Sequence, residues 1–295
     1  MMETTKKKKR RPGDLAFDIF NMCVMILLIF ITLFPIWHVL VASFSSPTAV
    51  SEGRVSLWPV DITFYSYETV FKMDNIWTSY LNTIFYSFVG TAFSMFLTIC
   101  GAYPLSKKRL RGRSFLSFMI TLTMWFGAGM MPVYLNFRNF GLLNTRTSLL
   151  LFGAVSAFNL LLLRTYFESV PDSIEESAKI DGASDLRIML TMYLPLSTAA
   201  IMTVSMYYLI GRWNAYFWAS ILLKDESKIP IQVLLRKLVV EMNQTAESGA
   251  MDYNKTSRET ITYTIMIVAT LPMIVVYPYV QKFFVKGVMV GAVKG

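Results

Sequence analysis

Six long apolar stretches limit what this chain can fold into. They lie at about residues 15–43, 76–105, 115–135, 148–167, 192–223 and 260–284. A helix needs roughly 20 apolar residues to cross a bilayer, and each stretch has that length. Only 16% of the 295 residues are charged, against about a quarter in soluble domains. We therefore predict an all-α polytopic protein of the cell membrane, with six transmembrane helices between residues 15 and 284.

Basic residues cluster beside these stretches and predict the orientation of the helices. Six lie in Lys6–Arg11, and five lie in Lys107–Arg113. Such clusters stay on the cytoplasmic side of a membrane, so we expect residues 1–14 and the tail 285–295 to be cytoplasmic. The same side then receives the loop 168–190 between the fourth and fifth helices. The clustering accounts for the net charge of +9 without nucleic acid, and Lys6–Arg11 is expected to touch anionic lipid.

The loop after the fourth stretch carries a run of acidic residues. Six carboxylates lie within residues 168–185, with apolar stretches on both sides. Ser173 followed by Glu176 predicts a capping box at the start of a short helix. Gly182 permits a turn, and Ser184 can begin a second short helix. We therefore expect a helix–turn–helix that projects from the membrane and is held by another protein.

This loop resembles the EAA loop of the permease subunits of binding-protein-dependent ABC importers. The family pattern E-A-A-x3-G-x9-I-x-L-P reads here as Glu176-Ser177-Ala178, then Gly182, then Met192-Tyr193-Leu194-Pro195. Ser177 in place of alanine and Met192 in place of isoleucine are two small departures, and neither changes the charge. The motif has the family's spacing and lies in the predicted cytoplasmic loop.

The resemblance extends over nearly the whole chain and points to sugar importers. The tail residues 281–287 and 291–295 are similar to those of the second permease subunit in importers of the maltose type. Four further stretches resemble a Gram-positive branch that takes up products of complex polysaccharides, including uronic-acid oligomers. These stretches are 55–59, 129–132, 141–145 and 211–214.

The resemblance implies a transport subunit rather than an enzyme. Such a permease translocates an oligosaccharide, and an acidic, polysaccharide-derived oligosaccharide is the narrower expectation here. The implied partners are a second homologous permease subunit, two ABC ATPase subunits and an extracellular lipid-anchored sugar-binding protein. ATP and Mg²⁺ bind to the ATPase subunits, so this chain is expected to hold no cofactor and no metal.

The resemblance also assigns ATPase coupling to the acidic loop. In such importers the EAA helix docks in a cleft of an ATPase subunit, where acidic side chains meet basic groups. Ile174 and Ala178 are expected to pack against the apolar walls of that cleft. ATP-driven closure of the ATPase pair then rocks the attached helices between inward-facing and outward-facing states. The predicted coupling residues are Ser173, Glu175, Glu176, Ala178, Asp181, Gly182, Ala183 and Pro195.

Arg212 is the only charge well inside a predicted span. An ionisable group at such a place is a functional candidate, and Arg212 in a cavity would offset the charge of an acidic cargo. Alternatively, Arg212 extends to the outer headgroups while its stem stays in lipid. Trp213 and Tyr216 can stack on sugar rings or serve helix packing. Asn214 and Asn82 can hydrogen-bond sugar hydroxyls, which completes the predicted substrate path.

Other classes of function lack their signatures. The sequence contains no G-x-x-x-x-G-K-[ST], G-x-S-x-G or H-E-x-x-H motif, so it has no ATP-binding loop and no hydrolase motif of these kinds. Asp181-Gly182 fits part of the metal site of membrane phosphatidyltransferases, but Ala178, Asp185 and Leu186 replace its other residues. A secondary transporter is the remaining alternative, although the chain shows no clear internal repeat.

Overall fold

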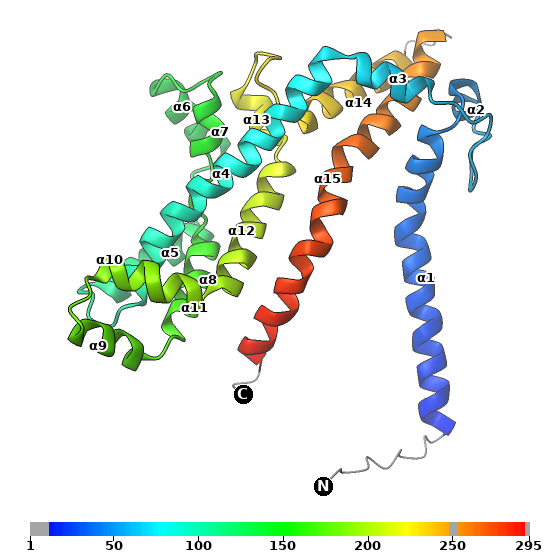
Figure 1. Ribbon diagram of the computed structural model, residues 1–295. Helices are drawn as coiled ribbons and strands as arrows, with labels where there is room; N and C mark the ends of the chain where they lie inside the picture. The colour runs from blue at the N-terminus through cyan, green and yellow to red at the C-terminus, as the bar shows by residue number, and fades with distance from the viewer. Residues whose placement is uncertain (1–11, 248–252, 293–295) are drawn as a thin grey trace. The chain divides into compact units, whose positions relative to one another are not determined.

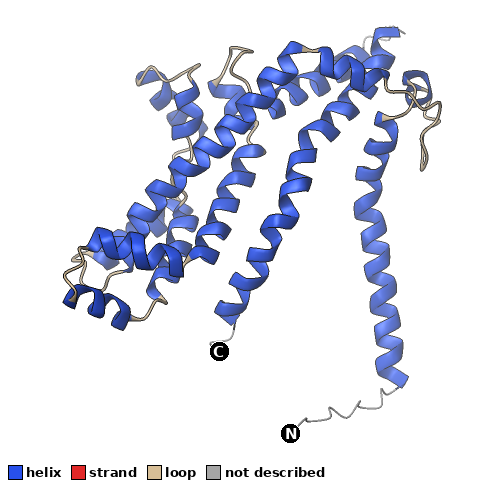
Figure 2. Cartoon of the chain, viewed as in Figure 1, coloured by secondary structure: helices blue, strands red, loops and turns tan. Residues whose placement is uncertain are grey.

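The computed structural model describes residues 12–247 and 253–292, and within these ranges every regular element is a helix (Figures 1 and 2). The predicted all-α class is therefore confirmed for the described residues. The basic run Lys6–Arg11 and the end of the tail, residues 293–295, lie outside them. The chain divides into two units, residues 1–70 with 248–267 and residues 71–247 with 268–295.

The first unit is built around one long apolar helix. Helix α1 (Pro12–Ser43) is followed by α2 (Pro47–Ser51) and most of α3 (Tyr65–Lys72), and the unit includes the first part of α15 (Tyr253–Ala292). A small core of Val41, Ala42, Ala49 and Val55 lies where α1 ends. Trp37 fixes the following loop by donating from Nε1 to the carbonyl of Leu57 at 2.8 Å.

Most of α1 exposes apolar side chains along its length. Its most apolar window has none of its residues buried inside the chain. A helix that is apolar all round needs lipid or protein around it, because water does not solvate such a surface favourably. Helix α1 therefore has the character of a membrane-embedded helix.

The second unit is a bundle in which α4 (Asp74–Ser106) packs against α8 (Ala157–Glu168) and α12 (Thr198–Trp213). Small polar residues of α4, including Ser87, Ser94 and Thr98, are fully buried. Small residues let helix backbones approach closely, which is how membrane helices associate. Larger side chains such as Leu163, Phe167 and Tyr193 fill the core at the end of the bundle that carries the acidic loop.

Two of the predicted spans are sharply bent. Helices α5 (Arg113–Trp125) and α6 (Met130–Asn139) meet at 112°, where Gly129 adopts a φ of +81°. The predicted fifth span, residues 192–223, is preceded by α10 (Asp185–Ile188) and starts within a π-helical turn (Met189–Tyr193), and the chain bends by 84° between α11 (Leu194–Leu196) and α12. Broken helices persist in a membrane only where protein or a wet cavity covers the freed backbone.

The predicted fourth span is also divided. Residues 148–167 fall into α7 (Arg146–Leu151) and α8, which are separated by residues 152–156. The described residues contain three helices long and apolar enough to cross a membrane, or up to five spans if each bent pair counts as one. Several apolar helices are thus present in the described residues, and the count of six stays a prediction. Helices α13 (Phe217–Leu222) and α14 (Ile231–Glu247) and the later part of α15 also belong to the second unit.

Candidate functional site

The acidic loop forms the predicted helix–turn–helix, with a different start. Helix α9 (Asp172–Ile180) begins directly after Pro171, and no side chain caps it. The predicted capping box is therefore wrong: Ser173 lies inside the first turn, and its carbonyl accepts a bond from Ser177 Oγ. The prediction for Ser184 is confirmed, since its Oγ accepts the backbone N–H of Arg187 at the start of α10.

Gly182 ends α9 as expected. Its φ is +78°, a region that glycine adopts without steric cost. The N–H of Gly182 bonds to the carbonyl of Lys179, and the N–H of Ala183 bonds to the carbonyl of Ala178, both at 3.0 Å. This pair of bonds is a Schellman motif, which satisfies the last carbonyls of the helix and turns the chain toward α10.

The apolar face of α9 is turned toward the chain itself. Ala178 is 1% exposed and Ile174 packs against the same core. These two side chains, expected to contact a partner, are therefore used within this chain. Other apolar side chains of the loop face outward: Ile180 is 88% exposed, Leu186 63% and Leu190 52%. Ser173, Glu176, Asp181 and Pro195 are exposed as well.

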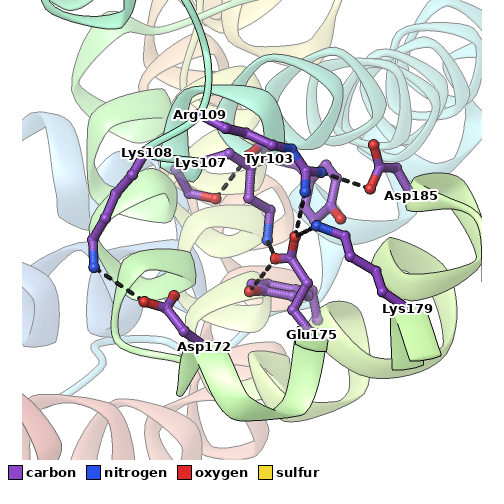
Figure 3. Close-up of polar contacts among 10 residues, drawn as sticks. Tyr103, Lys107, Lys108, Arg109, Asp172, Glu175, Lys179 and Asp185 are labelled. Carbon is purple, nitrogen blue, oxygen red and sulfur yellow. Dashed lines mark hydrogen bonds and ion pairs between the residues drawn. The ribbon is translucent and has the colours of Figure 1, made fainter. Parts of the chain in front are cut away.

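Glu175 is buried on the inner face of α9, in a cluster of cations (Figure 3). Its Oε2 accepts from Lys107 Nζ at 2.5 Å and from the Tyr193 hydroxyl at 3.1 Å. Its Oε1 accepts from Arg109 Nη1 at 2.8 Å and from Lys179 Nζ at 2.5 Å. A carboxylate offers about four lone-pair sites, so these donors occupy its capacity.

Lys107 is the most enclosed of these cations. Its Nζ lies 3.5 Å from the centroid of the Tyr193 ring and 4.4 Å from that of Tyr103. Burial lowers the pKa of Lys107, and the hydrogen bond and charge of Glu175 act against that shift. The lysine stays paired in a pocket whose walls are the faces of two aromatic rings.

Further ion pairs join the basic loop after α4 to the acidic loop (Figure 3). Arg109 pairs with Asp185 at 2.6 Å, and Lys108 pairs with Asp172 at 3.0 Å. Nearby, Glu168 pairs with Arg113 and with Arg164. The two loops that the charge pattern predicts on one side of the membrane therefore meet at one end of the second unit. The charge pattern alone predicts only an orientation role for the basic loop, whereas the structure shows that its charge also complements that of the acidic loop.

A cavity of about 440 Å³ lies in the second unit among residues of α4, α7, α8, α12 and α13. Arg212 lines it. Its Nη1 donates to the carbonyl of Leu149 at 2.9 Å, and its Nη2 donates to Ser94 Oγ at 2.8 Å and to the carbonyl of Leu150 at 3.2 Å. Its Nε is buried without a partner. Arg212 thus points into the unit, and neutral oxygens accept all of these bonds.

Two other predicted substrate residues have structural partners. Trp213 is 3% exposed and donates from Nε1 to the carbonyl of Ala269 at 3.1 Å. The buried Asn82 donates to the carbonyls of Ser227 and Ile229 and accepts from Arg146. Neither side chain is presented to a ligand here.

The remaining two predicted substrate residues, Asn214 and Tyr216, are exposed and do not line the cavity. The aromatic rings that line it are different ones. They belong to Tyr86, Phe152, Phe158, Tyr207, Tyr208 and Trp218. In the sequence these residues look like ordinary packing aromatics of apolar stretches, so no local signal marks them. Within the described ranges, no group of three or more His, Cys, Asp or Glu side chains could hold a metal ion.

Comparison with known proteins gives matches over nearly the whole length. Residues 5–290 match the family described as binding-protein-dependent transport system inner membrane component. The polygalacturonan/rhamnogalacturonan transport system permease protein YtcP of Bacillus subtilis (strain 168) is 40% identical over 281 residues, which are 95% of this chain and 98% of YtcP. Protein LplC of the same organism is 35% identical over 281 residues, with 95% of each chain covered.

Solved structures agree with these matches. One chain of a bacterial ABC transporter involved in the import of the acidic polysaccharide alginate has a TM-score of 0.87 and 43% identity, and the match covers 94% of this chain and all of that one. A chain of the alginate transporter in complex with an alginate pentasaccharide-bound periplasmic protein has a TM-score of 0.65 at 15% identity. The second likeness shows the fold alone.

Proposed function

This chain belongs to the binding-protein-dependent transport system inner membrane components, and on that basis we propose that it carries an acidic oligosaccharide across the cell membrane while separate ATPase subunits hold the loop 168–190. The family resemblance found in the sequence is thereby confirmed. Its relatives are permeases of ABC importers, which are membrane transport subunits rather than enzymes. A secondary transporter or a membrane enzyme no longer has support.

The outer face of α9 and α10 supports ATPase docking at this loop. Ile180, Leu186 and Leu190 expose apolar surface beside the acidic Glu176 and Asp181. An exposed apolar patch with charged residues at its rim is typical of a protein interface. The apolar contacts with an ATPase cleft are therefore assigned to Ile180, Leu186 and Leu190, because Ile174 and Ala178 are packed inside. Glu176 and Asp181 are placed to meet basic groups of the partner.

The ion pairs also support the proposed sidedness. The basic loop 107–113 and the acidic loop are joined at one end of the second unit. Near the other end, Asn144 Oδ1 accepts the N–H groups of Lys224 and Asp225. This grouping of the loops agrees with the charge pattern and supports a cytoplasmic position for the end with loop 107–113, as the positive-inside tendency predicts.

The cavity at Arg212 is the proposed cargo path within this chain. A guanidinium inside a span whose hydrogen bonds all go to neutral oxygens attracts an anion. The names of two relatives refer to the transport of acidic polysaccharides, polygalacturonan for one and alginate for the other. An acidic oligosaccharide fits both the positive charge of Arg212 and the polysaccharides named for these relatives.

One chain does not form the whole importer. We expect a second homologous permease subunit, two ABC ATPase subunits that bind ATP and Mg²⁺, and an extracellular lipid-anchored sugar-binding protein. The exposed apolar length of α1 leaves room for lipid and for a neighbouring subunit. A periplasmic protein with bound sugar is part of the complex named for one solved structure that shares this fold.

Docking of an ATPase on the exposed acidic and apolar face can be tested with Glu176→Lys and Gly182→Asp. Both variants should reach the membrane, lose most of the co-purified ATPase and lose uptake. Asp172→Asn is the matched control, because Asp172 is an exposed acid of the same helix that pairs with Lys108. Normal ATPase co-purification and uptake in Gly182→Asp would refute the docking site.

A further inference from the structure

Glu175 and Glu176 are neighbours in the sequence and lie in opposite environments. Glu176 is exposed on the proposed docking face. Glu175 is 8% exposed, and its two oxygens accept four hydrogen bonds from Lys107, Arg109, Lys179 and Tyr193. A carboxylate filled in this way has no free lone pair for a basic group of another protein.

The partners of Glu175 come from separate elements that meet at one end of the second unit. Lys179 is on α9 itself, whereas Lys107 and Arg109 follow the last residue of α4. The backbone of Lys107 is tied to α4 by its N–H, which donates to the carbonyl of Pro104 at 3.1 Å. Glu175 therefore connects the short helix α9 directly to the end of the long helix α4.

The third element at this point is the broken fifth span. Tyr193 lies in the π-helical turn before α12, donates to Glu175 and places its ring beside Lys107. The buried carboxylate of Glu175 thus contacts the end of α4 and the start of the fifth span at once. A displacement of α9 has to move both helices or break ion pairs in a partly dry site, which costs far more than breaking exposed pairs.

From this geometry we propose that Glu175 is a positioning residue that makes α9 move as one body with α4 and the fifth span. It acts within the chain and is not a contact for the ATPase. The docked partner pulls on the outer face of α9, and the bonds of Glu175 carry that displacement to the helices that line the cavity. This inference rests on the proposed function, since it concerns the path between the docked ATPase and the cargo.

The test uses the complete importer in proteoliposomes, with both permease subunits, the ATPase subunits and the binding protein. For Glu175→Gln, three quantities are measured: ATPase retained by the purified complex, ATP hydrolysis stimulated by loaded binding protein, and sugar imported per ATP hydrolysed. We expect retention and hydrolysis close to wild type, with import per ATP lower by roughly tenfold, within the range of energetic coupling between distant sites. Asp172→Asn, which breaks an exposed pair of the same loop, should match wild type.

A covalent link provides the second measurement. In a chain with Cys23 and Cys100 replaced by serine, Lys107→Cys and Glu175→Cys are combined and joined by a short bifunctional thiol reagent. We expect import per ATP to be low before cross-linking and to recover after it, because the link replaces the ion pair as the connection between α4 and α9.

The results for the Glu175 variants test the positioning role of Glu175 and can be told apart from a failure of the proposed transport function. Loss of ATPase from Glu175→Gln, as predicted for Glu176→Lys, would make Glu175 a docking contact and overturn the proposal. Unchanged import per ATP would also overturn it. If Glu175→Gln fails to accumulate, the cross-linked chain decides, with recovery in support and no recovery against. Failure of the proposed function would show instead in the wild-type complex, as absence of ATPase or of import.

Discussion

Arg212 lies directly against Gly90. A Cβ at position 90 would be 2.6 Å from Nη1 of Arg212 and 2.8 Å from its Cδ. The absence of a side chain at Gly90 is what lets the guanidinium pass α4 and reach Ser94 and the last carbonyls of α7. Gly90 in the second span therefore makes room for Arg212, the only charge well inside the predicted fifth span.

Gly90→Ala should displace Arg212 and destabilise the protein. The guanidinium would give up bonds to buried oxygens, at a cost of about 1–3 kcal/mol in the free energy of unfolding. Thermal unfolding of the purified protein measures this. Gly211→Ala is the control, since a Cβ there meets nothing within 4 Å and alanine favours a helix. Equal stability of the two variants would contradict the close contact.

Arg212→Gln should affect acidic cargo more than neutral cargo. Glutamine can still donate to one carbonyl of α7 but carries no charge. Uptake of an oligouronate is expected to fall by at least roughly tenfold relative to that of a neutral oligosaccharide of equal length, as for loss of one charge-assisted bond. Equal losses for both sugars would remove Arg212 from the cargo site and leave it as a structural residue that holds α7.

Ile180→Glu and Ala178→Leu should fail in different ways. Ile180 is almost fully exposed, so the charge should leave stability unchanged while less ATPase co-purifies. Ala178 is 1% exposed, and leucine there would overpack the core at a cost of about 1–3 kcal/mol in unfolding free energy. Stability and ATPase co-purification are measured on both variants. Loss of ATPase from a stably folded Ala178→Leu variant would restore the inner face as the docking face.

Alkaline pH should weaken the connection between α4 and α9. Burial lowers the pKa of Lys107 below the 10.5 of an ordinary lysine, so its ion pair with Glu175 is present below that lowered pKa and lost as pH rises through it. The fold itself should not weaken over this pH range, because a neutral Lys107 no longer carries the cost of a buried charge and its contribution to folding stability rises. We therefore expect import per ATP to fall, through loss of the ion pair, while the protein stays folded. In Lys107→Arg, whose side chain stays charged, import per ATP should no longer fall at alkaline pH.

Local patterns predicted the elements of this protein well. Apolar length marked the helices, and Ser184 and Gly182 marked a helix start and a helix end, because each acts through bonds to residues at most five positions away. The family motif correctly predicted the family, while its assignment of ATPase coupling to the loop 168–190 stays a prediction. The prediction at Ser173 failed because the helix begins two residues earlier, with Pro171 at the cap position, where no side-chain oxygen caps it.

Features that depend on distant partners could not be predicted. Glu175 finds Lys107 across 68 positions, and Arg212 reaches Leu149 across 63. The neighbouring sequence does not indicate which side of either helix faces inward, so it cannot distinguish the buried Glu175 from the exposed Glu176. The break in the fourth span, by contrast, has local signals that its apolar length concealed: Gly153 adopts a φ of +63° just after α7, and Ser156 Oγ accepts the N–H of Asn159 at the start of α8.

Trp213→Phe and Trp218→Phe should separate packing from sugar contact. Trp213 is buried and its indole N–H bonds to the carbonyl of Ala269, so phenylalanine loses that bond, underfills the buried site and should lower stability by about 1–3 kcal/mol. The concentration of sugar needed for half-maximal uptake should stay unchanged. Trp218 lines the cavity instead, and its replacement should raise that concentration with little change in unfolding, because a smaller ring stacks less well on a sugar. Unfolding and uptake are measured on both variants, and the reverse pattern would return the cargo role to Trp213.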